Sequence, residues 1–228
     1  MKIYKKKEKG VVMDKKISVI IPAFNEEGNI DKVIKKAQKC EKVKEVIVVD
    51  NLSTDKTEEV SVKAGAKVVK CNMQGKGYAM EKGIEISSGD IIVFLDADIP
   101  SYSDDVIYQL ARPILENEID FVKSTFDREG GRVTELVAKP MLKLLYPDLQ
   151  YISQPLSGMI AGKKEIFNKL VFEKDYGVDV GILLDVANMK CKMEQVKIGR
   201  LENNSKDWKA LDKMATEVMS AILKRKKY

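Results

Sequence analysis

The sequence contains no histidine, and this absence excludes several classes of enzyme at once. Catalysis by a Ser-His or Cys-His pair is impossible, and no zinc site can use an imidazole ligand. The three cysteines, Cys40, Cys71 and Cys191, have no paired spacing, so we expect reduced thiols and a cytoplasmic location. No apolar run approaches the roughly 20 residues of a transmembrane helix, and the N-terminus lacks the apolar core of a signal peptide.

The positive charge of the chain is concentrated at its N-terminus. The formal net charge is +5, and residues 1–16 hold seven lysines against Glu8 and Asp14, a balance of +5. The rest of the chain is therefore neutral on balance, and we predict no nucleic-acid partner and no stable membrane association. We interpret residues 1–15 as a solvated basic tail and residues 1–228 as one domain.

Strand-like and helix-like segments alternate through the first hundred residues. Apolar runs predict buried strands at residues 17–21, 45–50, 66–71 and 91–95, and Pro22 is expected to stop the first. Asp55 and Glu58 predict a capping box for the second helix, which Gly65 should end. This alternation indicates an α/β fold with a Rossmann-like, mostly parallel sheet flanked by helices.

The pattern is less regular after Pro100. Its predicted elements are a helix at 103–117, a strand at 121–124, helices at 132–146 and 180–190, a strand at 194–198 and a helix at 207–226. The last helix places Leu211, Met214, Val218 and Ile222 on one face. We predict that this face packs on the domain, and the alternative is an amphipathic helix lying on an acidic membrane.

Acidic side chains follow the predicted strands where each strand ends. In "GDIIVFLDADIP", Asp96 and Asp98 follow a strand that is apolar on both faces. Ligands of open α/β sheets bind at the carboxyl ends of such strands, where Glu26 and Asp50 are also expected. Paired carboxylates suit Mg²⁺ or Mn²⁺ and, through that ion, a diphosphate. The sequence has neither Gly-x-Gly-x-x-Gly nor a Walker loop, so a dinucleotide or P-loop site is not favoured.

A second candidate site lies in "GGRVTE", in the second half of the chain. Glycines precede a predicted helix start, where free backbone N–H groups and the helix dipole favour an anion. Arg132 adds a fork of donors and Thr134 adds a hydroxyl group. The segment predicts a cradle for a phosphate or a carboxylate, and the alternative is an ordinary helix start after a flexible loop.

Four motifs of the first half, taken in order, resemble a known fold. "SVIIPAFNEEGNI", "VIVVDNLSTDKT", "GKGYAM" and "IIVFLDADIP" look like the nucleotide-binding half of the glycosyltransferase-A fold, including its Asp-x-Asp motif. The resemblance implies that residues 16–100 bind a nucleotide sugar and that residues 101–228 bind the acceptor.

Three motifs of the second half narrow the resemblance. "GGRVTELVAKPML", "QPLSGM" and "YGVDVGILLD" resemble glucosyl-3-phosphoglycerate synthases and their mannosyl relatives. This implies retaining transfer of a hexose from a nucleotide sugar, with UDP-glucose expected before GDP-mannose, to the 2-hydroxyl of 3-phosphoglycerate. It also implies Mg²⁺ or Mn²⁺ and a homodimer.

The strand ends and the resemblance together define a candidate site. Lys76, Arg132 and Asp179 are the predicted catalytic residues, and Asp98 and Asn203 are the predicted metal ligands. The predicted substrate-binding residues are Pro22, Ala23, Phe24, Glu26, Asp50, Ser53, Lys76, Asp96, Ala97, Gly131, Arg132, Val133, Thr134, Gly158 and Tyr176.

Two positions depart from the pattern of the family. Asp179 stands where a glutamate is expected, which shortens the reach of the carboxylate by about one methylene. Asn203 stands where the relatives have a metal-ligating histidine, and Asn204 is the alternative register; an amide oxygen can bind Mg²⁺ or Mn²⁺. Two other functions remain open: a polyprenyl-phosphate sugar synthase, and a nucleotide-sugar-binding protein without turnover.

Overall fold

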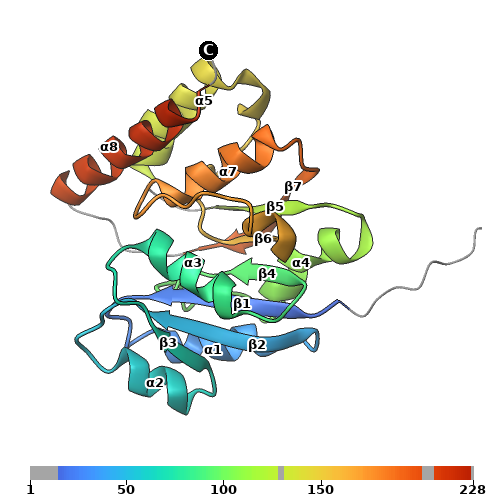
Figure 1. The fold of residues 1–228 in the computed structure, drawn as a ribbon, viewed down its shortest axis with the longest axis vertical. Coiled ribbons are helices and arrows are strands. Elements are labelled where there is room, and N and C mark those ends of the chain that lie inside the picture. Colours follow the sequence, from blue (N-terminus) through green and yellow to red (C-terminus); the bar gives the residue numbers. More distant parts are fainter. Residues whose placement is uncertain (1–14, 128–130, 202–207, 227–228) are drawn as a thin grey trace, which may run out of the picture.

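The computed structural model describes residues 15–127, 131–201 and 208–226 (Figure 1). Strands and helices alternate along most of the chain, as the sequence pattern predicts. In order, the elements are β1 (Ile17–Ala23), α1 (Ile30–Ala37), β2 (Val43–Asp50), α2 (Thr57–Lys63), β3 (Lys67–Lys70), α3 (Lys76–Ile86), β4 (Ile91–Phe94), α4 (Val106–Glu116), β5 (Phe121–Asp127), η1 (Thr134–Ala138), α5 (Lys139–Leu145), η2 (Pro147–Leu149), β6 (Ile160–Lys163), α6 (Lys164–Phe167), α7 (Val178–Asn188), β7 (Met193–Arg200) and α8 (Trp208–Lys224).

These strands form a seven-stranded sheet in the order β3-β2-β1-β4-β6-β5-β7. Strands β3, β2, β1 and β4 pair in parallel, and β5 pairs in parallel with β7. Strand β6 is antiparallel to both of its neighbours and joins the two parallel groups. The sheet is therefore mostly parallel, which confirms the predicted fold class.

Helices cover both faces of the sheet because the strands alternate in the direction of their side chains. In β1, Val19 and Ile21 join the core under α1 and α4, whereas Ile20 joins the core under α3, α6 and α7. All three side chains are fully buried, as expected for a central strand of a three-layer α/β sandwich.

Helices α5 and α8 form an additional layer on α7, and in Figure 1 the red α8 runs beside the yellow α5. Val218 and Ile222 of α8 are fully buried in this layer, and Leu211 and Met214 pack against it. The prediction that this face packs on the domain is confirmed. Within the described parts of the chain, no helix has both the length and the apolarity needed to cross a bilayer.

Local structure departs from the sequence prediction at three places. Strand β1 continues through Pro22 to Ala23, because β4 pairs with β1 only as far as Ile20 and the missing N–H of Pro22 removes no bond on that side. Strand β6 was not predicted from the sequence. The predicted helix at 132–146 contains a π-helical turn, η1, ahead of α5.

The predicted capping box of α2 does not form. Asp55 accepts the N–H of Thr57 at 2.9 Å, but it also accepts the N–H of Glu27 at 3.1 Å and so links the loops after β1 and β2. Glu58 pairs with Lys70 at 2.7 Å instead of turning back to the helix start. Asp55 therefore holds two loops together and caps only in part.

Candidate active site

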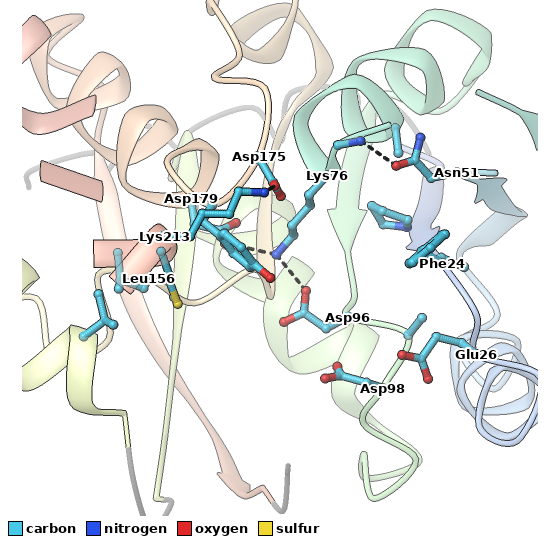
Figure 2. Close-up of a pocket in the computed structure, with 18 of the residues that line it drawn as sticks. Phe24, Glu26, Asn51, Lys76, Asp96, Asp98, Leu156, Asp175, Asp179 and Lys213 are labelled. Carbon is cyan, nitrogen blue, oxygen red and sulfur yellow. Dashed lines mark hydrogen bonds and ion pairs between the residues drawn. The ribbon is translucent and has the colours of Figure 1, made fainter. Parts of the chain in front are cut away.

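A cleft of about 670 Å³ lies beyond the carboxyl ends of β1 and β4 (Figure 2). It brings the strand ends of the first half together with the helix start and the loop before α7 in the second half. The predicted site residues that line it are Pro22, Ala23, Phe24, Glu26, Lys76, Asp96, Ala97, Asp98, Gly131, Arg132, Val133, Thr134, Tyr176 and Asp179. Their individual roles remain predictions.

Lys76 joins the two halves of the chain at the back of this cleft. Its Nζ donates to Asp96 Oδ1 at 2.9 Å and to Asp179 Oδ2 at 3.0 Å (Figure 2). Burial opposes the charge of Lys76, but Asp179 and Asp96 outweigh it and hold its pKa far above the usual range. Lys76 is therefore a permanent cation that compensates Asp96, the first of the two acids after β4, together with Asp179 of the second half.

Asp179 keeps one carboxylate oxygen for another partner. Its side chain is 9% exposed on the first turn of α7, and Oδ2 is taken by Lys76. Among the described residues, none hydrogen-bonds to the buried Oδ1. A buried acceptor without a donor is costly, so a substrate hydroxyl group is the natural partner for this oxygen.

Glycines let the backbone and the ion pair approach closely at this point. A Cβ on Gly77 would overlap the carbonyl oxygen of Glu173, against which the start of α3 packs. A Cβ on Gly158 would overlap Lys76 Nζ and Asp96 Oδ1. Gly158 is therefore needed by the ion pair, although it is not among the residues that line the cleft.

Tyr102, which sequence reasoning missed, fixes the loop that carries Asp96 and Asp98. Its hydroxyl accepts the N–H of Asp96 at 3.1 Å and donates to the Asp96 carbonyl at 3.3 Å. Tyr102 is almost fully buried, and burial together with Asp96 raises the pKa of its hydroxyl, so it stays a neutral donor.

Glu26 and Asp98 both line one end of the cleft (Figure 2). Burial raises the pKa of Glu26, a hydrogen bond from Asn29 lowers it, and the charges of Asp98 and Asp55 raise it further. Carboxylates therefore lie close enough to one another at this end of the cleft for their charges to repel.

The other end of the cleft is the helix start around Arg132. Gly131 has a φ of +86°, a left-handed conformation that favours glycine, and the chain then enters η1. Thr134 is buried, whereas Arg132 is exposed and lies 5.0 Å from the centre of the Trp208 ring. Both residues line the cleft, as the anion cradle predicted from "GGRVTE" requires.

Helix α8 supplies a wall of the cleft that the sequence did not predict. Leu211, Lys213 and Met214 line the cleft, and Lys213 pairs with Asp175 at 2.7 Å. Helix α8 also holds the loop before α7, because Glu217 of α8 accepts the N–H of Tyr176 in that loop at 2.9 Å. The other lining residues that were missed are Asn51, Gln74, Gly75, Ala79, Leu156 and Asp175.

Asp50 and Ser53 form a turn that stops short of the cleft. Asp50 Oδ1 accepts the N–H of Ser53 at 3.2 Å, and Ser53 Oγ accepts the N–H of Asn25 at 3.0 Å. Asn51, which directly follows Asp50, does line the cleft and accepts the N–H of Gly75 at 2.7 Å. The predicted metal ligand Asn203 and its alternative Asn204 lie outside the described residues.

The family model of glycosyl transferase family 2 matches residues 18–175, which include the residues at the ends of β1 and β4 that line this cleft. The chain belongs to glycosyl transferase family 2. Members of this family transfer a sugar, and Asp96 and Asp98 line the cleft of this glycosyltransferase.

Similar proteins of this family have a more specific description. A curated glucosyl-3-phosphoglycerate synthase from Petrotoga mobilis is 37% identical, covering 98% of this chain and 76% of the relative. A crystal structure of the Mycobacterium tuberculosis synthase with Mn²⁺, UDP-glucose and phosphoglyceric acid has a TM-score of 0.88 and 36% identity, covering 92% of this chain and 79% of that one. Another crystal structure of the same synthase, with Mg²⁺ and UDP, has the same TM-score and identity and covers 93% of this chain and 79% of that one. The glycosyltransferase-A fold is confirmed.

Lys123 of this glycosyltransferase lies buried behind the cleft and was not predicted. It is 1% exposed on β5, and its Nζ donates to the carbonyl oxygen of Asp179 at 3.0 Å. Burial lowers the pKa of Lys123 to about 8, against the opposing charge of Asp179. Its ammonium group and Lys76 therefore hold Asp179 from two sides.

Proposed function

We propose that this glycosyltransferase moves glucose from UDP-glucose to the 2-hydroxyl of 3-phosphoglycerate, with retention of configuration at the anomeric carbon. The observation that carries the proposal is that one cleft joins the Asp96–Asp98 loop to the anion-favouring helix start at Arg132 and Thr134. The first feature suits a nucleotide sugar, and the second suits an acceptor with a phosphate and a carboxylate. The similar synthases, which are described with these two substrates, support the same assignment.

The donor occupies the end of the cleft formed by the first half of the chain. Phe24 is 45% exposed and offers a ring face to the base, and Asp96, which also lines the cleft, is the proposed contact of the nucleoside. Lys76 adds a permanent positive charge close to the sugar and the diphosphate. The free oxygen of Asp179 accepts a substrate hydroxyl group.

Mg²⁺ or Mn²⁺ fits the acidic end of the cleft. Asp98 and Glu26 supply hard oxygen donors, and both line this end of the cleft. Within the described residues, no group of three or more metal-ligating side chains occurs, which suits an ion that also takes water, diphosphate oxygens and, by proposal, Asn203. When bound, the ion supplies positive charge to the departing diphosphate.

The acceptor is placed by the second half of the chain. Arg132 and Thr134 bind its anionic groups, so that its 2-hydroxyl reaches the anomeric carbon on the side of the leaving group. The bond from the sugar to the diphosphate breaks as the bond to the acceptor oxygen forms, and a departing phosphate oxygen takes the hydroxyl proton. No protein nucleophile is assigned.

A product assay tests the proposal against its rivals. The protein is incubated with Mg²⁺ or Mn²⁺ and a panel of nucleotide sugars, with either 3-phosphoglycerate or a polyprenyl phosphate, and the products are identified by mass. A glucosyl-phosphoglycerate formed from UDP-glucose supports the proposal. Transfer to the polyprenyl phosphate alone would replace it with the lipid acceptor, and donor binding without any product would indicate a binding protein.

A cytoplasmic homodimer completes the proposal. The three cysteines are free thiols in the structure, as a reducing compartment requires. Leu136 of η1 and Leu144 of α5 are 73% and 79% exposed, which offers apolar surface to a second copy. Light scattering after size-exclusion chromatography gives the mass in solution, and a monomer at micromolar concentration would contradict the dimer.

A further inference from the structure

Three cations line the cleft, and they differ in what compensates their charge. Lys76 is held by the two aspartates described above. Lys213 lies 2.7 Å from Asp175 and 3.7 Å from Glu217. Arg132 makes no ion pair with any residue that the structure describes, and its charge is met by an aromatic ring instead. Arg132 is therefore the cation in this cleft whose charge is available to an anionic ligand.

The ring belongs to Trp208, the first residue of α8. The centre of the ring lies 5.0 Å from the guanidinium carbon of Arg132, within the range of a cation–π contact. Trp208 is 74% exposed, so packing in the hydrophobic core does not account for the position of its ring. An exposed tryptophan over a cleft cation that has no ion pair among the described residues points to a functional contact.

The position of Trp208 is fixed by the packing of α8. Trp208, Leu211 and Met214 recur at a spacing of three and so share one face of the helix. Leu211 and Met214 line the cleft, and Val218 farther along is fully buried. The same packing that builds the cleft wall therefore brings the indole ring over Arg132.

We propose that Trp208 is a positioning residue that holds the Arg132 guanidinium ready for the anionic group of the acceptor. This inference rests on the proposed function for the identity of that acceptor. The attraction acts through the face of the ring, so it leaves the N–H donors of Arg132 free for a carboxylate or a phosphate. A carboxylate in the place of Trp208 would neutralise Arg132 and compete with the acceptor, whereas an indole ring orders the side chain without competing.

Kinetics of two substitutions separate positioning from general packing. Trp208→Ala should raise the KM for 3-phosphoglycerate about two- to fivefold, the usual range of an exposed cation–π contact, with kcat and the KM for the nucleotide sugar unchanged. Trp208→Phe keeps a ring and should restore most of the loss. Leu223→Ala, at an exposed position of the same helix, is the matched control. Equal KM values in the wild type and Trp208→Ala, or equal increases for both substrates, would overturn the proposal.

Fluorescence gives a second readout, because Trp208 is the single tryptophan of the chain. Titration with 3-phosphoglycerate, and more weakly with inorganic phosphate, should change the Trp208 emission in a saturable way that Arg132→Ala abolishes. A response to phosphate that depends on Arg132, without turnover of 3-phosphoglycerate, would support the Trp208–Arg132 site and reject the proposed acceptor. No response to either anion, or the same response in Arg132→Ala, would reject the site itself.

Discussion

Replacing Lys123 with methionine should remove a pH-dependent contribution to the stability of the protein. Lys123 is fully enclosed on β5, and its one hydrogen bond to a described residue goes to the carbonyl oxygen of Asp179. Burial lowers its pKa to about 8 from an ordinary value of 10.5, with Asp179 and Asp96 opposing the change and Lys76 adding to it. Methionine has a similar length and no charge, so it keeps most of the packing.

The sign follows from the protons bound in each state. Between about pH 8 and 10.5 the unfolded chain keeps the proton on Lys123 and the folded chain has lost it, so the free energy of unfolding rises with pH. The full cost of burying the charge, about 3 kcal/mol, applies below pH 8 and disappears above pH 10.5. Between about pH 7 and 9, the wild type should gain about 1 kcal/mol of unfolding free energy relative to the variant.

Urea unfolding at about pH 7, 8 and 9, followed by circular dichroism, measures this difference. Comparing the wild type with Lys123→Met at each pH removes the contributions of the other titrating groups. Lys32→Met, on the exposed side of α1, is the matched control for exchanging a lysine for a methionine. A difference between the wild type and Lys123→Met that stays constant from pH 7 to 9 would refute the lowered pKa.

Three further substitutions test the cleft. Asp98→Asn should keep the fold but slow turnover roughly a hundredfold, which corresponds to a loss of about 3 kcal/mol of charge stabilisation in the transition state. Near-normal turnover of a folded Asp98→Asn variant would show that Asp98 is not part of the metal site. Arg132→Ala should raise the KM for 3-phosphoglycerate about ten- to a hundredfold and that for the nucleotide sugar much less, and equal effects would mean that the helix start is not the acceptor cradle. Gly158→Ala should destabilise the fold by about 1–3 kcal/mol and lower kcat, because its methyl group would displace Lys76 from Asp96; an unchanged thermal midpoint would contradict that contact.

Local patterns were enough to predict most of the sheet and its helices. The runs in β1, β2 and β4 are apolar on both faces, which is typical of central strands. Strand β6 was missed because four residues, one of them Gly162, give no periodicity, and its pairing depends on β4 and β5 from distant parts of the chain. The π-helical turn of η1 has no sequence pattern of its own, because an amphipathic segment looks alike in both helix types.

The two sides of the cleft differed in how well the sequence predicted them. Asp96, Asp98 and Glu26 follow strand ends, so the topology of an α/β sheet places them together. Asn51 has the same signal and could have been found, because it directly follows β2. The cleft wall formed by α8 could not have been predicted from the sequence, because the apolar face of that helix has the same pattern whether it packs on a core or lines a cleft. Lys123 gave no signal, because a lysine in a short strand is usually exposed.

The polar contacts that hold α8 on α7 and on the loop before it have a consequence for partial unfolding of the protein. Arg225, just beyond the end of the helix, donates to Asp185 of α7 and to Glu173, and Glu217 of α8 accepts the N–H of Tyr176 in the loop before α7. None of these contacts involves β1 to β4. If α8 opened as one cooperative unit, the acceptor end of the cleft would be dismantled while the donor end stayed folded. In hydrogen exchange, the α8 amides should then be less protected than those of β1, and a bound acceptor should slow their exchange more than a bound nucleotide does.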